Sequence, residues 1–158
     1  MLLMVLEGWE LKNLDKEIKK DSGNFNVICE LANDSLKVHR IKKASSKIEG
    51  RIQEVCHHFA LFCVAAKRPM NGIQTLRMAA EAMGANETVT AAHTACAVLC
   101  LKAKCFQHCE DLFSKPVTAG NKYMKPIDVA NYNMYRGLIF CGLHKFEKAF
   151  DCFRMIMQ

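Results

Sequence analysis

The chain has 158 residues, of which 51% are hydrophobic, and its formal net charge is +6. No apolar run approaches the roughly 20 residues that span a bilayer, and the apolar start of the chain lacks the basic segment of a secretory signal. The nine cysteines are an odd number, which argues against a disulfide framework. We therefore expect an intracellular protein with reduced thiols and no membrane segment.

Apolar residues recur at three- and four-residue steps along most of the chain, as in helices, and no segment alternates as a half-buried strand would. We expect Asn33-Asp34-Ser35 to break the second helix, Pro69 to stop the third, and Asn71 to cap the fourth. The sequence thus predicts an all-α chain with helices at about 2–18, 25–32, 48–66, 71–84, 87–103, 106–113, 127–141 and 145–157.

One spaced pattern occurs twice, with every position recurring forty residues later. Its first copy is Ala97, Cys100, Phe106, Cys109 and Phe113, and its second is Gly137, Phe140, Phe146, Ala149 and Phe153. Small residues let two helices approach closely, while the larger side chains fill the space beside the contact. Repeated hairpins of this period indicate an α-solenoid of TPR-like helical hairpins, which mostly binds partners. We expect these ten residues to have a packing role.

Positive charge is concentrated between residues 37 and 51, where Glu49 is the single acidic residue. The basic residues there are Lys37, Arg40, Lys42, Lys43, Lys47 and Arg51. This stretch is the expected contact for an acidic partner, and a solvated helix face is the alternative. Nucleic-acid binding is a less favoured function because no aromatic residue lies between Phe25 and Phe59 to stack on bases. We divide the chain into N-terminal helices with the basic stretch (1–47) and a TPR-like repeat region (48–158).

A metal site is the sharpest alternative to packing. Its candidate ligands lie within fourteen residues and are Cys96, Cys100, Cys105, His108 and Cys109. Zinc favours thiolate and imidazole ligands. However, the second copy of the pattern has Phe140 and Ala149 in place of Cys100 and Cys109, and the sequence has no Cys-x-x-Cys knuckle. We therefore favour packing, and expect no metal and no cofactor.

A cysteine nucleophile is the catalytic alternative, and Cys56 beside His57 and His58 is its only basis. Neither a third orienting group nor a glycine-rich oxyanion turn accompanies these residues, and the metalloprotease signature His-Glu-x-x-His is absent. We therefore expect no catalytic residue and no enzyme activity in this chain.

Three stretches carry a resemblance to a known family: residues 67–73, 93–106 and 135–149. In order and spacing they resemble the N-terminal helical-repeat region of COP9 signalosome subunit 3, and the resemblance covers residues 52–158. The second copy also matches the tetratricopeptide pattern in part, with departures at Asn133 and Arg136. A proteasome-lid scaffold subunit is the nearest alternative family.

The resemblance implies a non-catalytic scaffold subunit of a complex that removes the ubiquitin-like protein NEDD8 from cullins and so regulates ubiquitin ligases. The metalloprotease centre of that complex lies in a different subunit. The implied partners are other signalosome subunits rather than a small-molecule substrate, and the implied location is the cytoplasm and nucleus. Members also carry a C-terminal winged-helix (PCI) module, which we expect to be absent from this chain.

Overall fold

The computed structural model describes residues 25–38, 46–83, 88–115, 119–120 and 124–157. Its elements are α2 (Phe25–Val38), α3 (Ser46–Ala65), α4 (Pro69–Met83), β1 (Thr88–Val89), α5 (Ala91–Ala103), η1 (Gln107–Cys109), α6 (Glu110–Ser114), β2 (Ala119–Gly120), α7 (Pro126–Gly142) and α8 (Phe146–Arg154). The predicted all-α class is confirmed, because β1 and β2 form only a two-residue parallel pair. The expected helix at 2–18 lies outside the described residues. Within the described ranges, none of the helices combines the length and apolarity needed to cross a membrane.

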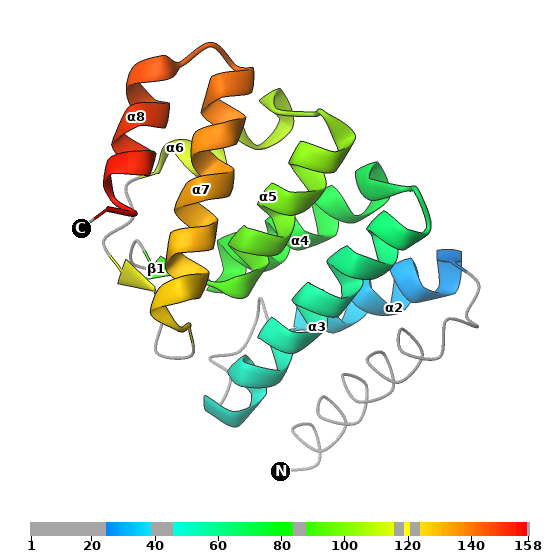
Figure 1. Ribbon diagram of the computed structural model, residues 1–158. Coiled ribbons are helices and arrows are strands. Elements are labelled where there is room, and N and C mark those ends of the chain that lie inside the picture. Colours follow the sequence, from blue (N-terminus) through cyan, green and yellow to red (C-terminus); the bar gives the residue numbers. More distant parts are fainter. Residues whose placement is uncertain (1–24, 39–45, 84–87, 116–118, 121–123, 158) are drawn as a thin grey trace.

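Successive hairpins stack on one another, with α5 in the middle of the stack (Figure 1). α3 packs against α5, and α5 against α7, so the first helices of three hairpins lie side by side. α4 packs against both α3 and α5, α8 packs against α7, and α2 packs against α4. Buried residues from all of these helices form one hydrophobic core. The boundary expected between residues 47 and 48 falls in the first turn of α3.

The central helix α5 is built almost entirely from small or slender apolar residues. Its buried residues are Ala92, His93, Ala95, Cys96, Ala97, Leu99 and Cys100. A helix that is apolar on all sides is stable only when it is surrounded, and α5 contacts α3, α4 and α7. Small side chains allow three neighbouring axes to approach the same helix at once. α5 is therefore the element that joins the hairpins.

The starts of three helices differ from those expected. α4 begins at Pro69 rather than after Asn71, because proline is well suited to the first position of a helix, where its missing N–H is no loss. Pro126 begins α7 in the same way. α5 begins at Ala91 rather than near residue 87, because Thr88 and Val89 pair with β2.

The expected break at Asn33-Asp34-Ser35 is wrong, since α2 continues through it to Val38. Ile28, Ala32 and Leu36 are all buried and continue one apolar face past the polar residues. The side-chain carbonyl of Asn33 accepts a hydrogen bond from the hydroxyl of Thr75 on α4. An asparagine whose amide is engaged in this way has no reason to cap or end the helix.

α3, α5 and α7 all end in the same backbone turn. The repeat seen in the side chains is therefore present in the backbone as well. Lys67, Lys104 and His144 adopt left-handed conformations with φ of 56°, 53° and 58°. At the end of α5 the N–H of Lys104 donates to Leu101 and that of Cys105 donates to Cys100. Forty residues later, His144 and Lys145 make the same two bonds at the end of α7. This is the Schellman motif, here formed without the usual glycine.

The N-terminus of α5 contains a buried, uncharged histidine. The backbone N–H of Thr90 donates to Nδ1 of His93 over 3.2 Å, and the His93 ring meets Tyr132 edge-on with 6.1 Å between the ring centroids. Burial, with a smaller contribution from Lys115, lowers the pKa of His93 to about 4 from its usual 6.5. Protonation would therefore cost both the desolvation of a charge and the hydrogen bond to Thr90.

We predict that His93 makes the chain less stable as the pH falls from about 6.5 to about 4. In this window the unfolded chain binds a proton that the folded chain does not, so the stability present above pH 6.5 is lost, by at most roughly 3 kcal/mol. His93→Gln should remove this part of the pH dependence while still accepting the Thr90 N–H. Urea unfolding of wild type and His93→Gln at several pH values in this window measures the free energy of unfolding. The same dependence of that free energy on pH in both proteins would contradict the prediction.

Candidate functional site

The structure places the ten repeat residues mostly inside the hairpins. The buried ones are Ala97, Cys100, Cys109, Phe113, Gly137, Phe140 and Ala149. Phe106 and Phe153 are half-buried, whereas Phe146 is 63% exposed. Corresponding positions in the two copies are thus buried alike at the first, second and fourth places, whereas the aromatic residues of the second copy, Phe146 and Phe153, are more exposed than Phe106 and Phe113.

α7 and α8 approach each other closely at Gly137. A Cβ atom built on Gly137 would overlap the ring of Phe153, whose Cδ1 atom would lie only 2.9 Å away. Ala149, one turn before Phe153 on α8, is 2% exposed. The missing side chain of Gly137 therefore provides the space that the Phe153 ring occupies.

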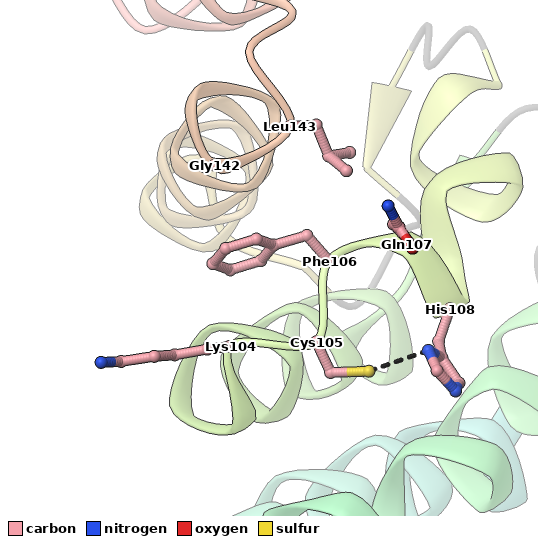
Figure 2. A pocket seen from close by; sticks show the side chains of 7 residues that line it. All are labelled: Lys104, Cys105, Phe106, Gln107, His108, Gly142 and Leu143. Atoms are coloured by element: carbon pink, nitrogen blue, oxygen red, sulfur yellow. Dashed lines mark hydrogen bonds between the residues drawn. The ribbon is translucent and has the colours of Figure 1, made fainter.

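Phe106 joins the second hairpin to the third (Figure 2). Its ring lies against Gly142 at the end of α7, so closely that a Cβ atom there would overlap it. A shallow pocket of about 280 Å³ surrounds this contact. The equivalent residue, Phe146, is exposed, and its ring meets that of His144 edge-on with 6.0 Å between the ring centroids.

Arg136 stabilises the end of α6, a role that the sequence analysis missed. It donates to the carbonyl oxygens of Phe113 over 2.6 Å and Lys115 over 3.1 Å. A second link between the hairpins is the ion pair of Lys145 with Glu110. The available signal was the departure at Arg136 from the tetratricopeptide pattern. A basic side chain can satisfy carbonyls at a helix C-terminus that leucine cannot.

A groove of about 770 Å³ lies over the first helices of the three hairpins, α3, α5 and α7. Leu61 on α3 contributes an apolar side chain that is 52% exposed, and Val98 on α5 contributes another. His57 and Asp128 add polar groups, and the half-buried ring of Tyr135 comes from α7. A hollow of this size with mixed lining can hold a segment of a partner protein.

The basic stretch falls largely outside the described residues. Arg40, Lys42 and Lys43 lie there, and for Lys37 and Lys47 only the helical backbone is described. Arg51 is half-buried on α3. Contact between this stretch and an acidic partner stays a prediction.

The five candidate metal ligands separate into two groups. Sγ of Cys105 and Nδ1 of His108 lie 2.9 Å apart on the surface (Figure 2). Inside the molecule, the sulfur atoms of Cys96, Cys100 and Cys109 all lie within 4.8 Å of one another, and we refer to these three residues as the thiol triad. All nine cysteines are free, as expected for reduced thiols.

The three thiols of the triad differ in the direction in which their pKa values are shifted. Hydrogen bonds with Cys100 and Cys96 lower the pKa of the Cys109 thiol, and the nearby Arg77 guanidinium lowers it further. Hydrogen bonding within the triad and burial raise the pKa of Cys96 and of Cys100. The three thiols therefore titrate as one coupled group.

The structure does not assemble the cysteine nucleophile considered from the sequence. Cys56 is fully buried, and burial raises the pKa of its thiol to about 12. His57 is exposed at the groove, and its ring centroid is 5.9 Å from that of His58. A thiol that is neutral near pH 7 and hidden from solvent is a poor nucleophile.

Comparison with known proteins identifies the family to which this chain of helical hairpins belongs. The profile of the family "COP9 signalosome complex subunit 3, N-terminal helical repeats" matches residues 12–158. The chain belongs to this family. The match to these signalosome repeats begins forty residues earlier than the resemblance noted above, and so includes α2.

One relative shows how similar the sequence of this chain is to a signalosome subunit, and over what length. COP9 signalosome complex subunit 3 of Dictyostelium discoideum is 29% identical over 97 residues, which cover 58% of this chain. The matched region covers only 23% of that relative. No solved structure matches the chain. The chain thus matches about a quarter of the length of this relative.

We predict that Gly137→Leu destabilises the chain by about 1–3 kcal/mol through overpacking against Phe153. The loss should occur although leucine favours helix more than glycine does. Chemical unfolding measures it, with Met134→Leu on the exposed side of α7 as the control. Removing the ring by Phe153→Ala should abolish most of the extra cost of Gly137→Leu. A wild-type unfolding midpoint for Gly137→Leu would disprove the contact.

Proposed function

We propose that this chain is a non-catalytic scaffold of the COP9 signalosome. In this role it supports assembly of a complex that removes NEDD8 from cullins and thereby regulates ubiquitin ligases. The observation that carries the proposal is the match of signalosome subunit 3 repeats along residues 12–158. The sequential packing of α3, α5 and α7 adds support, because stacked hairpins are used mainly to hold other proteins.

In mechanical terms, the scaffold is a segment of a TPR-like α-solenoid. Its hairpins are held in fixed relative positions by contacts such as Phe106 with Gly142 and Arg136 with the end of α6. A surface that spans several hairpins keeps its shape only if these junctions are rigid. The partner then binds without ordering the scaffold, which lowers the entropic cost of association.

The groove over α3, α5 and α7 is the proposed docking surface for another subunit. Leu61 and Val98 offer apolar contact area, and Tyr135 offers an aromatic side chain of the type enriched at binding hot spots. Glu54 and Asp128 provide acidic groups at the same groove. Lys125 lines the groove as well, so the bound segment would present mainly apolar side chains, with charged groups of both signs at its edge.

The remaining features of the proposal follow from this role. Association needs no catalytic residue, so the chemistry is assigned to another subunit. The basic stretch at 37–51 is proposed to contact an acidic surface of a neighbouring subunit. The proposed locations are the cytoplasm and nucleus.

We predict that the tagged chain captures signalosome subunits from cell extract, and that Leu61→Glu reduces this capture at least about tenfold. A charge placed at an apolar contact in the groove disfavours the bound state, whereas the exposed position tolerates it in the free chain. Leu138→Glu is the matched control, because Leu138 is similarly exposed, at 45%, but does not line the groove.

Quantitative mass spectrometry of the captured proteins provides the readout. Recovery of signalosome subunits by wild type and by Leu138→Glu, but not by Leu61→Glu, would support the docking surface. Recovery of proteasome-lid subunits in their place would move the chain to the related complex. Capture that is unaffected by Leu61→Glu would overturn the groove as the docking site.

A further inference from the structure

Three buried sulfur atoms meet at the turn between α5 and α6. Cys96 and Cys100 are one helical turn apart on α5, which places them on the same face. Cys109 ends η1 and approaches from the opposite side of the turn, with its sulfur 3.7 Å from that of Cys96. All three residues are 0% exposed.

The hairpin fold alone does not require sulfur at these positions. In the second copy, forty residues later, Arg136, Phe140 and Ala149 replace the three cysteines. The α7–α8 hairpin nevertheless forms the same backbone turn. The thiol triad is therefore a property of the α5–α6 hairpin, in addition to its packing.

The spacing of the triad suits coordination of a single metal ion. A thiolate ligand lies about 2.3 Å from zinc, and tetrahedral angles then place neighbouring sulfur atoms about 3.8 Å apart. The 3.7 Å between Cys96 and Cys109 is close to that value. Because no pair of triad sulfur atoms exceeds 4.8 Å, Cys100 needs to move by about 1 Å or less.

The surroundings of the triad allow an ion to enter. η1 and α6 have three and five residues, too short to be stable helices alone, so local opening there can expose Cys109 while α5 stays folded. Arg77 holds this segment by donating to the carbonyl oxygen of His108 over 2.6 Å and pairing with Asp111.

We propose that Cys96, Cys100 and Cys109 bind one soft, thiophilic metal ion at the α5–α6 turn. Thiolate ligands select copper(I) and zinc, and binding releases the three thiol protons to solvent. Within the described part of the chain the group contains three ligands. Copper(I) accepts three thiolates alone, whereas zinc adds a fourth ligand. The ion would link η1 and α6 to α5 and so hold the turn that follows α5 in place.

The test uses the full chain, reduced and freed of metal under argon. One arm titrates copper(I) supplied as its bicinchoninate complex, and the other titrates zinc sulfate against a chromogenic zinc indicator. In at least one arm we expect about one ion bound per chain and a melting temperature raised by about 5 °C or more. Tighter binding of copper(I) indicates three-coordinate thiolate, and tighter binding of zinc indicates an additional ligand.

Variants locate the ion. Cys109→Ala introduces the residue found at the equivalent position of the α7–α8 hairpin, Ala149. It should weaken metal binding at least about 100-fold, since even groups that only contact the ligands contribute that much. Cys56→Ala removes an equally buried thiol from α3 and should bind like wild type. A double change of Cys105→Ala with His108→Ala removes the surface pair and should also leave binding intact.

Several results would overturn the site. These are substoichiometric binding of both metals by wild type, undiminished binding by Cys109→Ala, or loss of binding only when Cys105 and His108 are changed. If Cys109→Ala does not fold, alkylation of wild type in mild urea decides the matter. Bound metal must then protect Cys96, Cys100 and Cys109 from the reagent, and equal labelling with and without metal contradicts the proposal.

Discussion

The slenderness of α5 is the constraint on which the rest of the structure depends. One helix of 13 residues contacts α3, α4 and α7, which is sterically feasible because its buried face consists largely of alanine and cysteine. Gly72 on α4 shows how close the approach is, since a Cβ atom there would lie 2.6 Å from the Leu99 side chain. Larger residues on α5 would separate the hairpins, and the groove across α3, α5 and α7 would lose its floor.

The repeat operates at two levels, side chains and backbone turns. Identical Schellman turns at Lys104 and His144 reverse the chain after α5 and α7, so each following segment returns along its own hairpin. Phe106 then carries the contact to the next hairpin at Gly142. This combination gives a rigid surface built from short, local connections, which suits the scaffold role proposed for the chain. In the α5–α6 hairpin, the same turn also brings together the thiol triad.

The periodicity of apolar residues predicted the helices and the repeat. The features that it did not predict depend on contacts between residues distant in sequence. α2 passes through Asn33 because Thr75, distant in sequence, engages the amide. The turns at Lys104 and His144 could not be recognised from their residue types, since glycine is the usual signal. Among the candidate ligands, spacing alone could not separate the buried triad from the Cys105–His108 pair, because η1 is a 3₁₀ turn that rotates Cys109 inward. Arg136 was visible only as a departure from a pattern.

The central claim is that α5 couples the hairpins into one cooperative unit. Hydrogen exchange measured by mass spectrometry tests this claim most directly. If α5 does so, peptides from α5, α7 and the α3–α4 hairpin will exchange their most protected amides together, with the free energy of global unfolding. The result that contradicts the account is separate behaviour: rapid exchange throughout α7 and α8 while α3, α4 and α5 stay protected. In that case the hairpins would be neighbours without being a single scaffold.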